Sequence, residues 1–407
     1  MIEIAVLGFG VVGSGTVEVL DKNSDRVARS AGQEVKVKYI LDIREFPGSP
    51  YESLFVKDFD MIVNDPDIAV VVEVIGGVDK ALEFTRRSLS AGKSVVTSNK
   101  ELVAAHGYEL LKLAGEKGVN YLFEASVGGG IPIIRPVAQC IAANIINEIY
   151  GILNGTTNYI LTEMARNGAE FSTALADAQK KGYAESDPTS DIMGHDACRK
   201  ICILSSLAFG RHIYQEHVPT EGIEAVTTED MDFAAKMGYK IKLLGRARLT
   251  GEKVAAYVAP HLIAADNMLA DVNGVMNGIV VRGNAVGDLM FYGAGAGKLP
   301  TASAVAADVI DAVKHIRLRK LLSWEEGGAD AVADPELLES AWYVRTNVTK
   351  DKVGHEFGEV VFAEGETAGE KSPATAFRTA VMNGKKVREI LNRGIPALSL
   401  FRVLGDY

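Results

Sequence analysis

The sequence predicts an α/β protein in which a parallel-sheet domain at residues 1–130 precedes an α+β domain at 131–320 and a small segment at 341–407. Three observations predict this organisation. Short apolar runs alternate with helical stretches over the first 130 residues, a glycine-rich turn joins the first run to the first helix, and the pattern changes after Gly128-Gly129-Gly130. Strands that alternate with helices pair in parallel through right-handed crossovers.

The composition sets limits on partners and location. Hydrophobic residues make up 47% of the 407 and charged residues 24%, as in an ordinary globular protein. The net charge of -10 leaves no basic surplus to neutralise phosphates, so we expect neither nucleic acid nor membrane as a partner. Three cysteines are too few for a disulfide framework. With no basic leader and no run of about 18 apolar residues, we expect a cytoplasmic protein.

The first domain is expected to contain four strands, most of them largely apolar. The apolar runs that predict them are Ile2–Leu7, Val35–Leu41, Ala69–Val74 and Ser94–Thr97. The helical stretches between and after them are Val11–Leu20, Lys80–Ala91 and Tyr108–Lys117. Mostly apolar strands are typical of a sheet that is covered on both faces.

A G-x-G-x-x-G turn follows the first strand and opens the first helix. It consists of Gly8, Phe9, Gly10, Val11, Val12 and Gly13. The first glycine permits a tight turn, the second lets the backbone approach a pyrophosphate, and the third allows close helix–strand packing. Free N–H groups at the helix N-terminus favour phosphate there. In this strand–turn–helix context the motif predicts a Rossmann-type domain that binds NAD or NADP.

The end of the second strand carries conflicting signals about the cofactor. Asp42 is the acidic residue expected to bind the ribose hydroxyls of NAD, although it lies farther from the glycines than the usual spacing of about 20 residues. Arg44 could instead meet the 2′-phosphate of NADP, or be a solvated loop cation. The choice between NAD and NADP therefore stays open.

The second domain mixes helices with strand-like runs, and the tail follows an acidic stretch. We expect strands at Asn147–Leu153 and Val254–Val258, and a linker or loose surface helix at 325–339. The tail is expected to hold strands at Trp342–Val348 and Glu359–Ala363 and a helix at Ala374–Leu391.

A lysine lies on the apolar stripe of a helix predicted from about Ile192 to Phe209. Lys200 falls between Ala197 and Leu204, and Asp196 precedes it by one turn. A lysine on such a face needs a partner, and burial would lower its pKa while the carboxylate would raise it. The pair could form a proton relay beside the carboxylate-rich loop 182–188. It could also be an ordinary i, i+4 ion pair on the surface.

Seven ordered motifs make the chain similar to homoserine dehydrogenase over most of residues 1–320. They are GFGVVG at 8–13, TSNK at 97–100, FEASVGGGIPII at 123–134, NGTTNYIL at 154–161, GYAESDP at 182–188, DACRK at 196–200 and YGAGAGKLPTASAV at 292–305. The resemblance implies NAD(P)-dependent interconversion of L-homoserine and L-aspartate 4-semialdehyde, in the biosynthesis of threonine, methionine and isoleucine. It also implies a homodimer or higher homo-oligomer.

The resemblance assigns roles to residues at matching positions. Lys200 matches the catalytic lysine, Asp196 its acidic partner, and Lys100 the lysine beside nicotinamide and substrate. Matches to the substrate pocket are Glu185, which would bind the amino group, and Gly155, Thr156, Tyr183 and Asp191. Matches to a site for a monovalent cation, Na⁺ or K⁺, formed mainly by backbone carbonyls, are Glu124, Val127, Gly129 and Ile131.

The chain departs from the family pattern in two places. Leu41 stands where members often carry an arginine, which puts NADP preference in doubt. The segment Trp342–Gly354 resembles the start of an ACT regulatory domain, but the first helix of such a domain is hard to find in the sequence, and the remainder is short. We therefore expect a degenerate or truncated ACT-like segment and little inhibition by threonine.

Two rival functions are weighed against this one. Another semialdehyde oxidoreductase on the same scaffold would need a different substrate loop. A non-catalytic dinucleotide sensor would be favoured by the loss of Lys200, Glu185 or Asp196, and all three are present.

Overall fold

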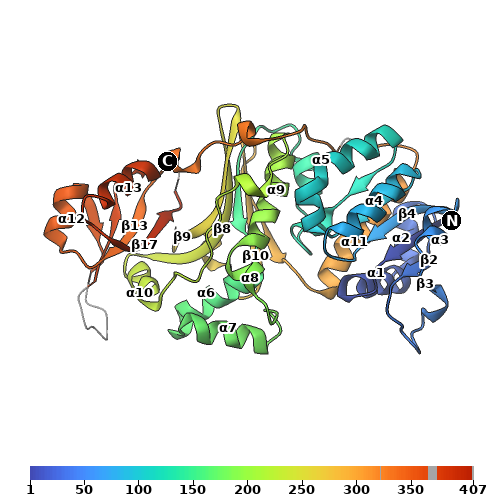
Figure 1. Ribbon diagram of the computed structural model, residues 1–407, viewed down its shortest axis with the longest axis horizontal. Helices are drawn as coiled ribbons and strands as arrows, with labels where there is room; N and C mark the ends of the chain where they lie inside the picture. The colour runs from blue at the N-terminus through green and yellow to red at the C-terminus, as the bar shows by residue number, and fades with distance from the viewer. Residues whose placement is uncertain (321, 365–373, 406–407) are drawn as a thin grey trace.

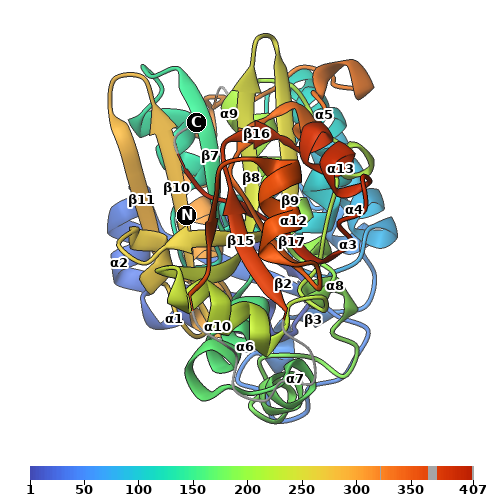
Figure 2. The ribbon, with the colours of Figure 1, turned by 90° about the vertical axis from the view of Figure 1, so that its left-hand side faces the viewer.

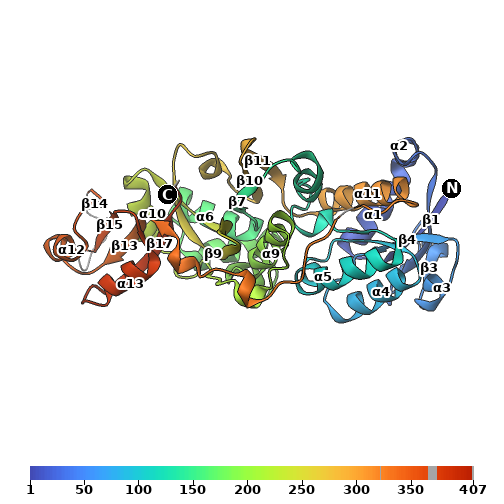
Figure 3. The same ribbon diagram turned by 90° about the horizontal axis from the view of Figure 1, so that it is seen from above.

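Three parts lie side by side along the long axis of the molecule, in the order of the sequence (Figure 1). The computed structural model describes residues 1–320, 322–364 and 374–405. The N-terminal sheet and its helices occupy one end, a large mixed sheet the middle and the tail the other end. The view from above shows the same succession (Figure 3).

The N-terminal domain is built on a six-stranded parallel sheet, as predicted. Its strand order is β3-β2-β1-β4-β5-β6. The strands are β1 (Ile2–Leu7), β2 (Val35–Leu41), β3 (Phe55–Val56), β4 (Ile68–Glu73), β5 (Ser94–Thr97) and β6 (Tyr121–Leu122). The two-residue strands β3 and β6 were not predicted. The order of the sheet reverses between β1 and β4, which is where dinucleotides bind in such folds.

Helices cover both faces of this sheet, and one of them comes from far along the chain. The first five are α1 (Val11–Lys22), α2 (Ser24–Ala31), α3 (Asp60–Val63), α4 (Asp79–Ser90) and α5 (Lys100–Lys117). Helix α11 (Lys298–Lys314) packs against α1 and buries Val305 and Val309 in the same core as Val6 and Val72. The segment 298–314 lies within the range predicted for the second domain, yet it forms part of the first.

The middle of the molecule is a curved antiparallel sheet with helices on one face. Its strands follow the order β11-β10-β7-β8-β9. They are β7 (Ile146–Ile152), β8 (Tyr239–Thr250), β9 (Lys253–Ala264), β10 (Met276–Gly283) and β11 (Gly287–Ala294). The helices are α6 (Gly155–Asn167), α7 (Phe171–Lys180), α8 (Thr189–Ile192), α9 (His195–Phe209) and α10 (Thr228–Lys236).

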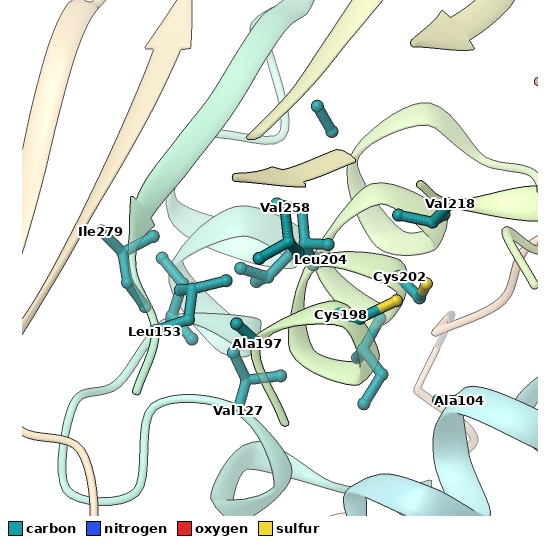
Figure 4. Packing of buried hydrophobic residues seen from close by; sticks show 14 of the residues in the cluster. Ala104, Val127, Leu153, Ala197, Cys198, Cys202, Leu204, Val218, Val258 and Ile279 are labelled. Atoms are coloured by element: carbon teal, nitrogen blue, oxygen red, sulfur yellow. The ribbon is translucent and has the colours of Figure 1, made fainter. Parts of the chain in front are cut away.

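Helix α9 brings the lysine-bearing stripe onto this sheet. Ala197 and Leu204 of the helix pack in one buried cluster with Leu153, Val258 and Ile279 from the sheet side (Figure 4). Ala197 and Leu204 of the predicted stripe are therefore buried, but Met193, which was predicted to belong to it, lies before α9 and is exposed. This packing fixes α9 beside the end of β7.

In the described residues the tail forms a β-α-β-β-α-β unit. Its elements are β13 (Trp342–Thr346), α12 (Lys350–Phe357), β14 (Val360–Phe362), β15 (Thr375–Thr379), α13 (Gly384–Leu391) and β17 (Ala397–Val403). The helix predicted at Ala374–Leu391 is wrong over its first part, because residues 375–379 are a strand. The first helix, which was hard to find in the sequence, is α12. The short strand β16 (Met382–Asn383) pairs with β12 (Glu339–Ser340).

The tail continues the central sheet (Figure 2). Strand β17 pairs in parallel with β9 through Arg402 and Val403, so the central sheet and the tail form one nine-stranded sheet. Arg345 Nε also donates to Asp230 Oδ1 at 2.7 Å, and Tyr343 Oη donates to the same oxygen at 3.0 Å. All three side chains are buried, so the tail is fastened to α10 as well as to β9.

The acidic stretch between the second domain and the tail packs against β9 and does not form a loose surface helix. It holds two short 3₁₀ turns, Ala329–Ala331 and Pro335–Leu337, and Val332 bridges to Val254 of β9. Trp324 just before it is buried, with its Nε1 donating to His212 Nδ1 at 2.9 Å. Across the described residues no helix combines the length and the apolar character that a membrane span needs.

Candidate active site

Lys100 is fixed at the start of α5, directly after β5. Asn99 caps the helix, because its Oδ1 accepts a hydrogen bond from the Leu102 amide at 3.0 Å. Its Nδ2 donates to the Gly77 carbonyl at 2.6 Å. The lysine therefore stands at the carboxyl edge of the parallel sheet, where ligands of such sheets bind.

Asp196 and Lys200 form a buried pair on the first turns of α9. Lys200 Nζ lies 2.8 Å from Asp196 Oδ2, and the two side chains are 9% and 3% exposed. Lys200 Nζ also donates to the Leu153 carbonyl at 2.8 Å. An ammonium group has three donors, so one is left for a substrate oxygen. Of the two interpretations of this pair, the surface ion pair is wrong.

Asp196 joins the two domains by pairing with a second lysine. Lys100 Nζ lies 2.5 Å from Asp196 Oδ1, so each carboxylate oxygen faces one lysine. Asn154 Nδ2 donates to Asp196 Oδ2 at 2.9 Å and to Asp191 Oδ1 at 2.7 Å. Lys100, Asp191, Asp196 and Lys200, all predicted from sequence, are thus brought together.

The four groups have different proton affinities because their surroundings differ. Burial lowers the pKa of Lys200, and the attraction of Asp196 only partly opposes it. For Lys100 burial also lowers the pKa, but Asp196 outweighs it and the net direction is upward. The two lysines hold the pKa of Asp196 below its ordinary range despite its burial. Burial raises the pKa of Asp191. Lys200 is therefore the lysine that gives up a proton more easily.

The N-terminus of α6 forms a second wall of the site. Asn154 caps the helix by accepting from the Thr157 amide at 2.8 Å. A Cβ on Gly155 would lie 2.6 Å from the Val275 carbonyl oxygen, so only glycine fits there. Thr156 Oγ1 donates to the Tyr183 carbonyl at 2.6 Å and so ties the 182–188 loop to the helix.

Glu185 is not brought into contact with the lysine pair. Its side chain is exposed, and its carbonyl accepts from Gln179 Nε2 at 3.1 Å. In the described part of the chain its carboxylate forms no ion pair. Tyr183, on the same loop, is 43% exposed and its ring lies 4.9 Å from that of Tyr159.

The glycine-rich turn has the geometry that a dinucleotide requires. Gly8 has a φ of +95°, which favours glycine. A Cβ on Gly13 would lie only 1.9 Å from the Gly8 carbonyl oxygen, so the third glycine permits the close approach of α1 to β1. The turn opens onto a cavity of about 580 Å³. Residues lining it include Gly8, Gly10, Asp42, Arg44, Lys57 and Lys80.

Asp42 and Arg44 are paired with each other at the rim of this cavity. Arg44 donates from Nε to Asp42 Oδ1 at 3.0 Å and from Nη2 to Oδ2 at 2.8 Å. The Phe9 amide also donates to Asp42 Oδ2 at 2.7 Å. Arg44 lowers the pKa of Asp42 to about 2. Phe9 itself packs its ring on Phe55, and Val11 is exposed at the start of α1.

The side chain of Glu124 is fully engaged by the protein. Its oxygens accept from the amides of Ile133 at 2.6 Å, Ile134 at 2.8 Å and Arg135 at 2.9 Å, and from Arg135 Nε at 3.0 Å. Val127 and Ile131 are buried, and Gly129 has a φ of +56°. If a cation binds this loop, main-chain oxygens and not the carboxylate must hold it.

Two site groups were missed by the sequence analysis. Asn154 holds both carboxylates, and its position directly before a helix, in the N-cap place, was the available signal. The Leu153 carbonyl, which accepts from Lys200, had no signal because a backbone oxygen leaves no trace in the sequence.

A dinucleotide turn, a facing cavity and a buried lysine–carboxylate pair at the domain junction define an NAD(P)-dependent oxidoreductase. Family models agree. A homoserine dehydrogenase model matches residues 132–310, and one for the NAD-binding domain of homoserine dehydrogenase matches residues 8–124. The chain belongs to the homoserine dehydrogenase family. It interconverts L-homoserine and L-aspartate 4-semialdehyde, a step of amino-acid biosynthesis.

Individual relatives are similar over most of the chain. Homoserine dehydrogenase of Pseudomonas aeruginosa is 43% identical over 362 residues, which is 87% of this chain and 83% of that protein. The structure of a homoserine dehydrogenase from Thiobacillus denitrificans has a TM-score of 0.87 at 36% identity and covers 99% of this chain and 98% of its own. A hyperthermophilic archaeal homoserine dehydrogenase in complex with NADPH has a TM-score of 0.65 at 28% identity, covering 76% and 97%.

Proposed function

We propose that Lys200 is the general acid and base of the reaction. The observation that carries this proposal is the buried carboxylate of Asp196, which is shared by lysines from two domains. In the oxidative direction, unprotonated Lys200 takes the proton of the substrate hydroxyl, and in the reductive direction its ammonium returns that proton to the carbonyl oxygen. Bound NAD(P) supplies the hydride chemistry at the substrate carbon.

Asp196 and Lys100 have supporting roles in this proposal. Asp196 holds Lys200 toward the substrate and stabilises its charged form. Lys100, whose pKa Asp196 raises, stays an ammonium and stabilises negative charge at the reacting oxygen. Because the cluster spans the two domains, the site is complete only when both are in place.

We propose that the substrate lies between this cluster and the N-terminus of α6. Gly155, Thr156 and Tyr183 form the wall, and Asp191 lies beside Asp196 through their common partner Asn154. Glu185 would bind the substrate ammonium group by moving with its exposed loop. Backbone amides at the start of α6 suit the substrate carboxylate.

Glu185→Gln should raise KM for homoserine and leave KM for the cofactor unchanged. The amide keeps the shape of the side chain but loses a charge-assisted bond to the ammonium group, which is worth about 1.5–3 kcal/mol. An increase of roughly ten-fold or more in steady-state KM is the expected result. Glu224→Gln is the matched control, because Glu224 is also an exposed glutamate and lies outside the site. An unchanged KM would make Glu185 an ordinary loop carboxylate.

We infer that the cofactor is held over the glycine-rich turn, with its adenosine ribose at Asp42 and Arg44. The glycine turn and the cavity support this placement. Asp42 accepts hydrogen bonds from a ribose hydroxyl only if it turns from Arg44, whereas a 2′-phosphate would draw Arg44 away from Asp42. Lys57 and Lys80 add positive charge to the cavity, which suits either pyrophosphate or 2′-phosphate. Both NAD and NADP therefore fit.

Homoserine-dependent reduction of NAD and of NADP, measured side by side, tests the proposed function. We expect turnover with at least one of them. Arg44→Ala should raise KM for NADP more than KM for NAD, because only NADP carries the phosphate. If homoserine supported the reduction of neither NAD nor NADP, the proposed site would be wrong.

We propose further that main-chain oxygens of Glu124, Val127, Gly129 and Ile131 bind Na⁺ or K⁺. Support comes from the glycine-containing loop and from the Glu124 carboxylate, which shapes the loop through amides of 133–135. Oxygen ligands suit hard cations.

We propose a cytoplasmic homodimer or higher homo-oligomer. Strand β11 lies at the edge of the large sheet and exposes Tyr292, and the backbone groups of such an edge can pair with a second chain. The three cysteines are free, as in a reducing compartment.

Truncation after Ser340 should lower the midpoint of thermal unfolding by several degrees and change the assembly, while some catalysis is retained. The cut removes β17 from the edge of β9 and Arg345 from buried Asp230, but every site residue lies before it. Thermal unfolding and size-exclusion chromatography of both chains check this. An unchanged midpoint and an elution shift explained by mass alone would contradict it.

Whether the tail is a regulatory ACT-like domain is tested with the same two chains. The prediction of little threonine inhibition rested on a missing helix, which α12 supplies, so that prediction has lost its basis. Threonine inhibition of the full-length chain that disappears on truncation would identify the tail as regulatory.

A further inference from the structure

Lys242 is a buried lysine that lies outside the lysine–carboxylate cluster. Lys242 of β8 is 3% exposed. Its Nζ donates to Asn158 Oδ1 at 3.0 Å, to the Val272 carbonyl at 2.6 Å and to Asn273 Oδ1 at 3.3 Å. Three acceptors match the three donors of an ammonium group. Burial nevertheless lowers the pKa of Lys242 to about 7, so holding the charge there is costly.

The acceptors connect one loop to one helix. Asn158 lies in the first turns of α6, and its Nδ2 donates to the carbonyls of Val272 at 3.1 Å and Met276 at 3.0 Å. One turn later, Thr162 Oγ1 accepts from the Gly274 amide at 3.1 Å. The 272–276 loop is thus fastened to α6 at two positions one helical turn apart, Asn158 and Thr162.

The same loop packs on the first residue of α6. A Cβ on Gly155 would lie only 2.6 Å from the Val275 carbonyl oxygen, so the loop and the helix are in close contact here. Directly before Gly155, Asn154 holds Asp191 and Asp196. A displacement of the loop would therefore change the position of Gly155 and Thr156 without touching the dinucleotide turn.

We propose that Lys242 is a positioning residue for the substrate pocket, which acts through the 272–276 loop and α6 to hold Gly155 and Thr156 in place. The inference rests on the proposed substrate role of these two residues. It assigns a function to a buried ammonium group whose three acceptors lie on α6 and on this loop.

Lys242→Met tests the proposal, with Lys240→Met as the matched control. Lys240 lies two residues away on the same strand, but it is partly exposed and pairs with Asp271 at 2.8 Å. For Lys242→Met we expect KM for homoserine to rise about ten-fold or more, since small misplacements of binding groups are costly. KM for the dinucleotide should change less than about two-fold. Lys240→Met should leave both constants as in the wild type.

A rise in KM for homoserine without a rise in KM for the dinucleotide is a result that general destabilisation of the protein does not produce. A folded Lys242→Met enzyme whose homoserine KM is unchanged, or whose two KM values rise together, would overturn the proposal. If that variant does not fold, Thr162→Val removes another tie between the same loop and α6. We expect a smaller rise in homoserine KM alone, and no rise would overturn the proposal.

Thr156→Ala separates failure of this inference from failure of the proposed site. If Thr156→Ala raises homoserine KM and Lys242→Met does not, the substrate site stands and the role of Lys242 is wrong. If Thr156→Ala has no effect on homoserine KM, the proposed site is wrong, and with it the basis of the inference.

Discussion

Lys200→Ala should lower turnover by about 10²–10⁴-fold, the usual cost of losing a positioned proton donor and acceptor. Dinucleotide binding should remain nearly intact, because Lys200 lies on α9 of the second domain and the glycine-rich turn lies in the first. The fold should also survive. Asp196 keeps Lys100 and Asn154 as partners when Lys200 is absent.

Two measurements together test this prediction. Steady-state rates give the loss of turnover, and a fluorescence titration with NADPH or NADH gives the affinity for the cofactor. Lys180→Ala is the control, because Lys180 is an exposed helical lysine outside the site and its loss should leave both quantities unchanged. A Lys200→Ala enzyme with nearly normal turnover would remove Lys200 from the mechanism.

Asp196→Ala should differ from Lys200→Ala, because we expect it to lower both turnover and the free energy of unfolding. The substitution leaves Lys200 buried without its carboxylate and Lys100 without its ion pair. Removal of one partner from a buried ion pair commonly costs about 3–5 kcal/mol. Denaturant unfolding should show a loss of this order, and turnover should fall at least as far as in Lys200→Ala.

Asp177→Ala is the matched control for stability. Asp177 also pairs with a lysine at i, i+4, Lys181, but both side chains are over a third exposed. Exposed pairs typically contribute about 0–1 kcal/mol. If Asp196→Ala and Asp177→Ala lowered the free energy of unfolding by equally small amounts, the buried cluster would not contribute the stability that its geometry indicates.

The Asp196–Lys200 pair could be predicted from the sequence, but the third member of the cluster could not be placed by spacing. One helical turn separates Asp196 and Lys200, so periodicity alone puts them on one face. Lys100 belongs to another domain, and its contact with Asp196 depends on how the two domains pack. Only the family resemblance pointed to Lys100.

The errors of the sequence analysis have a common physical cause. Residues 298–314 were assigned to the second domain, because the sequence does not show that α11 packs against α1 of the first domain. Residues 375–379 of the tail were assigned to a helix with 384–391. Their strand is fixed by pairing with β13 and β14, and such tertiary contacts override local propensity.

The pH dependence of homoserine oxidation tests the central claim most directly. Burial lowers the pKa of Lys200 below the ordinary lysine value of 10.5. Oxidation needs the unprotonated amine, so its rate should rise with pH and level off above that lowered pKa, whereas reduction should fall over the same interval. In Lys200→Ala the residual activity should show neither the rise of the oxidation rate with pH nor the fall of the reduction rate. If both rates changed over the same pH interval and by the same factor in wild type and Lys200→Ala, the account would be contradicted, because another group would then move the proton.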